Sequence, residues 1–313
     1  MILQLFIHPS VIFQSLVSGE TTMDQLLRLW VVIMLCTAFI CFVVGELSHN
    51  YSQTDKVWSL MPIVYSIITL YAFPSSPRIW LMTLLVTIWG LRLSYNFYRK
   101  GGYNKIPWKG EEDYRWGIVR QHPILRKGIR VTLFNLLFIS LYQHFLIFLF
   151  STPLLLAAEN ATVSLSGLDY LAAISMLLFI LLETIADNQL YSFRSLKRNK
   201  LFLNGKYKTS LHNGFLSEGL WKYVRHPNFV AEQVIWVSFY FFGVAASGQF
   251  LNWTVSGLFL LILLFAGSSE FTERISMDKY PDYKNYKQHV PKFIPLIFKS
   301  RKHGNSQSGF TKA

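Results

Sequence analysis

Residues 219–232 read Gly-Leu-Trp-Lys-Tyr-Val-Arg-His-Pro-Asn-Phe-Val-Ala-Glu and stand at the start of an apolar run that continues to Gly243. Proline fits the first turn of a helix, so a helix beginning at Pro227 would place Asn228 and Glu232 one turn apart on the same face. That face would carry a carboxylate just inside an apolar segment. Ionisable groups are costly in such a place, which predicts a functional role for this stretch.

The composition around this stretch is typical of an integral membrane protein. Of the 313 residues, 52% are hydrophobic and only 15% are charged, whereas about a quarter of the residues of a soluble domain are charged. The chain has 30 Lys and Arg against 17 Asp and Glu, and the basic residues gather between the apolar runs. Basic loops indicate the cytoplasmic side of a membrane and suit anionic lipids or a phosphate-bearing cofactor. We therefore expect a membrane as partner and no nucleic acid.

The apolar runs predict the fold class. The runs long enough to cross a bilayer, at ~1.5 Å per residue, are residues 26–45, 57–73, 78–98, 131–158, 168–190, 229–246 and 250–267. Basic and uncharged connections alternate between them. We predict an all-α, polytopic membrane bundle of about seven transmembrane helices, with the N-terminus outside and the C-terminus in the cytoplasm.

The same pattern predicts the organisation of the chain. We expect residues 1–25 to be an interfacial segment, residues 26–298 to form a single transmembrane domain, and residues 299–313 to form a polar basic tail. Cys36 and Cys41 have neither zinc nor disulfide spacing, so we predict no metal site. The N-terminus lacks a basic region followed by a cleavage site, so the first span is expected to serve as the targeting element.

A first polar cluster is expected where the fifth span ends. Glu183, Asp187, Leu190 and Arg194 have the spacing of one helical stripe. Two acids and a base on one face could hold the ribose and phosphates of a nucleotide. An ion-pair network within the helix is an equally good interpretation of the residues alone.

A second cluster is the opening stretch itself. Arg225 and His226 can bind phosphates, Asn228 can bind an amide, and Glu232 can accept from a ribose hydroxyl or stabilise charge. The alternative is that Arg225 extends to the membrane surface and His226 caps the helix. The spacing of Asn228 and Glu232 favours the functional interpretation.

Other polar residues left more than one interpretation open. Arg92 lies within the third apolar run, where it either pairs with an acid such as Asp187 or Glu232 or extends to the membrane surface. The tyrosine-rich segment 280–295 predicts an interfacial amphipathic tail. The chain has no GxxxxGK[ST], GxGxxG, GxSxG or HExxH motif, so soluble nucleotide folds, hydrolases and zinc proteases have no support.

Several short motifs together resemble membrane proteins related to the steroid 5α-reductase C-terminal domain, most closely an uncharacterised branch of the DUF1295 type. The motifs are residues 55–59 with Pro62, 89–93, 112–116, 186–189, 219–232 and 283–295, and the resemblance covers about residues 47–298. It implies NADPH-dependent reduction of a carbon–carbon double bond in a steroid, sterol or enoyl lipid. It also implies cofactor access from the cytoplasm and, in a eukaryotic host, location in the endoplasmic reticulum.

The resemblance also implies roles for individual residues. The expected cofactor contacts are Glu183, Asp187, Arg194, Tyr223, Arg225, His226, Asn228 and Glu232. Asn228 and Glu232 match the Asn and Glu of the reductase pattern Asn-Tyr-Phe-Gly-Glu, whereas Phe229 lacks the usual aromatic hydroxyl and Ala231 adds a methyl where Gly is usual. For the proton donor we expect Tyr95 or Tyr98.

Two alternative functions follow from the same residues. The Arg-His-Pro sequence and the tail are shared with isoprenylcysteine and phospholipid methyltransferases, which use S-adenosylmethionine, while residues 186–189 and 89–92 favour the reductase branch. A non-catalytic lipid-binding member of the fold is the second alternative, encouraged by the changes at residues 229–231.

Overall fold

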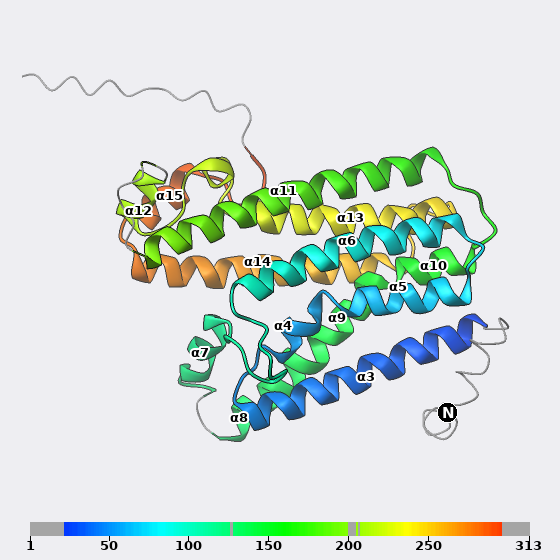
Figure 1. Ribbon diagram of the computed structural model, residues 1–313, viewed down its shortest axis with the longest axis horizontal. Helices are drawn as coiled ribbons and strands as arrows, with labels where there is room; N and C mark the ends of the chain where they lie inside the picture. Colours follow the sequence, from blue (N-terminus) through cyan, green and yellow to red (C-terminus); the bar gives the residue numbers. More distant parts are fainter. Residues whose placement is uncertain (1–21, 126–127, 200–204, 206, 296–313) are drawn as a thin grey trace, which may run out of the picture.

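The computed structural model describes residues 22–125, 128–199, 205 and 207–295 (Figure 1). Within these ranges all regular secondary structure is helical, which confirms the all-α prediction. Most of the expected interfacial segment and the whole of the expected polar tail lie outside the described residues. The domain boundaries at residues 26 and 298 stay predictions.

Five stretches of the described chain are long and apolar enough to cross a membrane. They are α3 (Met23–Ser48), the run Ile129–Glu159, α11 (Gly167–Arg198), α13 (Pro227–Ser247) and α14 (Val255–Lys279). The run Ile129–Glu159 is made of α8 (Ile129–Phe134), the π-helix η1 (Asn135–Tyr142), α9 (Gln143–Ser151) and α10 (Pro153–Glu159). The fold is therefore that of a multi-pass membrane protein.

The other two predicted spans correspond to different elements. Residues 57–73 are divided between α4 (Gln53–Trp58) and α5 (Met61–Ala72), and α5 has only 12 residues. Residues 78–98 form most of α6 (Pro77–Arg99), which has 23 residues but carries polar side chains toward its C-terminal end. The expected count of seven spans is thus not confirmed by length and composition, which support five.

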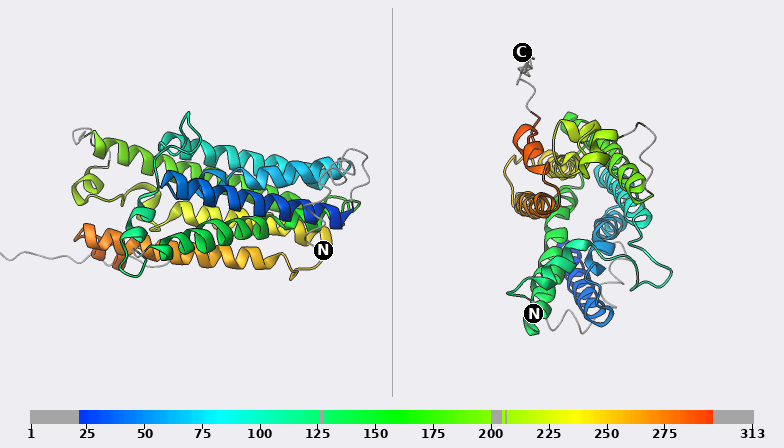
Figure 2. Two further views of the ribbon diagram at one scale, coloured as in Figure 1. Left: turned by 90° about the horizontal axis from the view of Figure 1, so that it is seen from below. Right: turned by 90° about the vertical axis from the view of Figure 1, so that its left-hand side faces the viewer.

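Three of the short helices gather at one end of the bundle. α7 (Tyr114–Gln121), α12 (Lys208–Asn213) and α15 (Tyr283–His289) lie at the end where α6, α11 and α14 finish (Figure 1). The connections around them carry many of the Lys and Arg residues that stand between the apolar runs. The uncharged connections lie at the opposite end, and the long helices run lengthwise between the two ends (Figure 2). We call the first of these the basic end.

The helices are apolar both inside and outside. Trp89 of α6 and Trp236 of α13 meet edge to face in the core, with ring centroids 4.8 Å apart. On the outer face of α11, Leu171, Ile174 and Leu178 are exposed. A helix that is apolar all round is typical of a membrane span, because lipid covers its outer face.

The segment that leads into α13 approaches α11 closely. Gly219 has φ +66°, and a Cβ atom added there would lie 2.5 Å from Gln189 Oε1. The same oxygen accepts a hydrogen bond of 2.9 Å from the Leu220 backbone N–H. Only glycine combines this backbone conformation with so close a contact. The contact with Gln189 brings the motifs 186–189 and 219–232 together in space. α13 then begins at Pro227, as predicted.

Candidate functional site

Arg92 of α6 is the centre of a buried polar cluster formed with α11 and α13. Its Nη2 lies 2.6 Å from Glu183 Oε2 and 3.7 Å from Glu232 Oε2, and its Nη1 lies 3.0 Å from Asp187 Oδ2. The side chain of Arg92 is 11% exposed, and those of the three acids are at most 7% exposed. Arg92 therefore pairs with both acids proposed for it and does not extend to the membrane surface. We call Arg92, Glu183, Asp187 and Glu232 the carboxylate cluster.

Side chains that the sequence analysis did not name as site residues complete the cluster. Trp89 Nε1 donates to Glu232 Oε2 at 2.9 Å, and Trp236 Nε1 donates to Glu232 Oε1 at 3.1 Å. Asn96 Nδ2 donates to Asp187 Oδ2 at 2.7 Å. Residues 89, 92 and 96 form one stripe of α6, so their spacing in an apolar run was the signal that could have identified them.

Asn228 lies at the edge of the cluster. Its Nδ2 is 3.5 Å from Asp187 Oδ1, while its Oδ1 is buried and has no hydrogen-bond partner among the described residues. Arg92 Nε is buried and has no partner in the same part of the chain. Unsatisfied polar atoms are rare in protein interiors and call for an explanation. An acceptor and a donor left over at one site are what a polar ligand would use.

Cationic side chains lie on the solvent side of the cluster, at the basic end. Neighbouring protein atoms partly desolvate the ammonium of Lys100, which follows α6, and so lower its pKa; the negative charge of Asp187 raises this pKa, and the charges of Arg194 and Arg99 lower it. These influences place the Lys100 ammonium within the electrostatic field of both Asp187 and Arg194. Lys100 and Arg194 are nevertheless exposed. The acids thus lie deeper in the bundle than the cations.

Arg225 and His226 belong to a separate network around Glu273 of α14. Arg225 Nε and His226 Nε2 lie 2.8 Å and 3.0 Å from Glu273 Oε1, and Glu273 is fully buried. Arg225 Nη1 also donates to the carbonyl oxygens of Lys287, at 2.9 Å, and of Val290. The two residues therefore tie the segment after α14 to the start of α13. Their role as phosphate ligands stays a prediction.

The predicted tyrosines lie outside the carboxylate cluster. Tyr95 and Tyr98 are each 63% exposed on α6 and do not belong to the stripe that carries Arg92. Tyr223 is 62% exposed. The structure thus brings Glu183, Asp187, Asn228 and Glu232 together, places Arg194 and Tyr223 at exposed positions, and separates Tyr95 and Tyr98 from the acids. No contact tests their catalytic or cofactor-binding roles.

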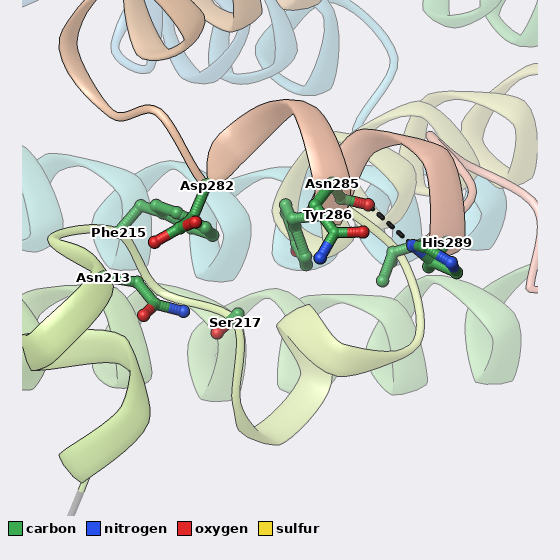
Figure 3. A pocket seen from close by; sticks show the side chains of 8 residues that line it. Asn213, Phe215, Ser217, Asp282, Asn285, Tyr286 and His289 are labelled. Carbon is green, nitrogen blue, oxygen red and sulfur yellow. Dashed lines mark hydrogen bonds between the residues drawn. The ribbon is translucent and has the colours of Figure 1, made fainter. Parts of the chain in front are cut away.

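A pocket of about 430 Å³ lies between α15 and the segment after α12 (Figure 3). It is lined by Asn213, Phe215, Ser217, Asp282, Asn285, Tyr286, His289 and Val290. His289 Nδ1 donates to the Asn285 carbonyl at 2.8 Å. The lining shares no residue with the carboxylate cluster, and it has no polar side chain buried without a partner. The cluster is therefore the stronger candidate site.

Comparison with known proteins identifies a family without an assigned activity. The profile of DUF1295, described as a protein of unknown function, matches residues 41–290. The chain is 37% identical over 262 residues to an uncharacterized protein of Schizosaccharomyces pombe, covering 80% of this chain and 74% of that protein. No solved structure matches the chain. The match includes both the carboxylate cluster and the Glu273 network, and the chain belongs to the DUF1295 family.

Proposed function

We propose that this protein is a membrane-embedded, NADPH-dependent oxidoreductase that reduces a carbon–carbon double bond of a steroid, sterol or enoyl lipid. The observation that supports the proposal most is the order of charges along the site. Buried acids and the amide of Asn228 lie inside the bundle, while Lys100 and Arg194 lie on their solvent side. This order matches a dinucleotide, which has anionic phosphates at its middle and hydroxyl and amide donors toward its reactive end.

The residues present fit such a cofactor. Asn228 Oδ1, buried and without a partner, could accept from a carboxamide N–H. Asp187 could accept from a ribose hydroxyl, and Lys100 and Arg194 could bind the phosphates. Bound there, NADPH would supply a hydride to the β-carbon of a polarised alkene.

The side chains of the site would then act through orientation and charge. Arg92 holds Glu183 and Asp187 in place, and the two indoles fix both oxygens of Glu232. Low exposure excludes water from this region, which strengthens the electrostatic interactions within it. An apolar substrate would reach the site from the bilayer. In a eukaryotic host we expect that bilayer to be the endoplasmic reticulum, and a relative does occur in a eukaryote, S. pombe.

One feature of the cluster favours a second candidate cofactor. Three carboxyl groups face a single guanidinium, and an excess of negative charge suits the cationic S-adenosylmethionine of a methyltransferase. S-adenosylmethionine has no phosphate, however, and offers a single carboxylate to the two cations Lys100 and Arg194, whereas the phosphates of NADPH could bind both. The charge order therefore favours NADPH.

The proposal is tested by measuring the thermal stability of the full chain in detergent with NADPH, NADH and S-adenosylmethionine. A ligand that binds only the folded state at 100 times its Kd stabilises by about 2.7 kcal/mol. We expect stabilisation by NADPH, and its loss in D187A and E232A. D24A, which removes an exposed acid that pairs with Arg28, is the matched control and should retain it.

Each other outcome identifies a different function. Stabilisation by S-adenosylmethionine alone would establish the methyltransferase alternative. Stabilisation by none of the three ligands would favour a non-catalytic lipid-binding protein. Unchanged NADPH affinity in both D187A and E232A would refute the assignment of the site.

A further inference from the structure

The segment that connects α6 to α7 forms a closed loop with an exposed tip. At its base the Glu111 backbone N–H donates to the Gly101 carbonyl oxygen at 2.8 Å, so the two arms of the loop meet there. Residues 104–109, which read Asn-Lys-Ile-Pro-Trp-Lys, are all exposed. We call residues 102–110 the α6–α7 loop.

Side chains of α4 hold the inner side of this loop. Lys56 Nζ donates to the carbonyl oxygens of Pro107, at 2.9 Å, and of Lys109, at 2.8 Å. Gln53 Nε2 donates to the carbonyl oxygen of Trp108 at 3.1 Å. Lys56 and Gln53 are both buried. Three successive carbonyl groups thus have partners inside the protein, so the tip can enter an apolar layer without leaving these groups unsatisfied.

The outer side of the loop presents two apolar and two cationic side chains. Ile106 is 38% exposed and Trp108 is 52% exposed. Lys105 and Lys109 flank them, and neither ammonium forms an ion pair or a hydrogen bond within the described part of the chain. Indole rings favour the boundary between membrane and water, and lysines near that boundary are attracted to anionic lipids. The composition of the tip therefore fits a lipid surface.

The outer face of α6 indicates where this boundary lies. Exposed apolar and aromatic side chains recur along it at helical spacing, namely Trp80, Leu84, Ile88, Leu91, Tyr95 and Tyr98. This stripe is aliphatic in the middle and aromatic at both ends, as expected for a helix that faces lipid. Trp80 and Tyr98 are 18 positions apart, which corresponds to ~27 Å and is close to the ~30 Å of a hydrocarbon core. Tyr95 and Tyr98 thus mark the membrane surface at the basic end.

The α6–α7 loop leaves the bundle at this level. Phe97 of α6 packs edge to face on Tyr103, with ring centroids 5.1 Å apart, and the Tyr103 hydroxyl donates to the Lys56 carbonyl at 2.6 Å. These contacts fix the loop beside the end of α6. In both views of Figure 2 the teal segment after α6 projects sideways from the bundle. A loop that projects sideways at the membrane surface meets the headgroup layer.

We propose that the α6–α7 loop is a lipid-binding site. Ile106 and Trp108 enter the headgroup layer of the leaflet at the basic end, and Lys105 and Lys109 bind the phosphates of anionic lipids. The site thereby holds α6, which carries Arg92, at a fixed depth in the bilayer. It is independent of the function proposed for the carboxylate cluster.

Fluorescence quenching of Trp108 in liposomes tests the proposal. The full chain is reconstituted in phosphatidylcholine that contains equal fractions of either brominated phosphatidylglycerol or brominated phosphatidylcholine. The emission of Trp108 is the difference between the wild type and W108F, because the other tryptophans contribute to both proteins and cancel. We expect both brominated lipids to quench Trp108. Phosphatidylglycerol should have the higher relative affinity, by about five-fold for each lysine at low salt.

Two double variants separate the lysines of the loop from the total charge. K105Q/K109Q should still be quenched by phosphatidylcholine but should lose the preference for phosphatidylglycerol. K208Q/K222Q is the matched control, because it removes two exposed lysines of the basic end that lie outside the loop, and it should keep the preference.

The same measurements can overturn the proposal. Quenching of Trp108 by aqueous acrylamide but by neither lipid would place the loop in water. Protection from acrylamide and from both lipids would show that another protein surface covers the loop. Equal affinity of the wild type for the two lipids, or a preference that K105Q/K109Q retains, would refute the binding of anionic lipids by the two lysines.

Discussion

Replacing Arg92 by Met should destabilise the protein more than any change in a surface ion pair. The substitution keeps much of the apolar stem but removes the only guanidinium among the described residues in contact with Glu183, Asp187 and Glu232. The acids would then lie buried without a counterion. A buried pair broken on one side is costly because the remaining charge has neither water nor a partner.

The magnitude follows from the contacts. R92M removes two charge-assisted hydrogen bonds, of 2.6 Å to Glu183 and 3.0 Å to Asp187. Such bonds are worth about 1.5–3 kcal/mol each, which gives about 3–6 kcal/mol and agrees with the ~3–5 kcal/mol found when one partner of a buried pair is removed. For a large domain a loss of about 3–6 kcal/mol corresponds to a fall in Tm of roughly 6–24 °C.

The assay is thermal unfolding of the detergent-purified proteins, followed by intrinsic tryptophan fluorescence. R28M is the matched control, because Arg28 pairs with Asp24 at an exposed position and surface pairs contribute only about 0–1 kcal/mol. In the double variant R92M/D187N, removal of one unpaired charge should recover part of the loss. A Tm for R92M equal to that of R28M would refute the account of the cluster.

Three further predictions concern the frame around the site. Arg78 Nε and Asp169 Oδ1 lie 2.7 Å apart and both side chains are fully buried. Thermal unfolding of R78M should therefore show a free energy of unfolding lower by about 3–5 kcal/mol, and R78M/D169L should recover most of this loss. A stability of R78M equal to that of the wild type would contradict this. Burial raises the pKa of Asp113, but the charge and hydrogen bonds of Arg115 outweigh it and the net pKa is lowered. The ionised Asp113 carboxylate therefore stabilises the folded protein fully above about pH 5, and this stabilisation is lost as the pH falls below about 4. When the pH is lowered over this range, the Tm of D113N should fall less steeply than that of the wild type. Gly219 has φ +66°, so G219A should cost at least about 1 kcal/mol in the same assay.

The sequence determined the class of the protein and identified all three acids of the carboxylate cluster as candidates. Apolar runs of bilayer length require helices, because a backbone in lipid must satisfy its own hydrogen bonds. The start of α13 at Pro227 followed from the fixed φ of proline, and helical spacing alone placed Asn228 and Glu232 on one face. The resemblance to a DUF1295-type branch likewise rested on short motifs, and the family match confirmed it.

Only the tertiary structure decided which charged residues are partners. The sequence left Arg92 with two interpretations, and the packing of α6 against α11 and α13 gave it three carboxyl groups at once. The tertiary structure also places Arg225 and His226 beside Glu273 of α14, although Arg225 is much closer in sequence to Glu232. Helical periodicity fixes the face on which a side chain lies but not the neighbour that covers this face. That neighbour is chosen by contacts between residues far apart in the chain, where a buried charge is stable only beside its counterion.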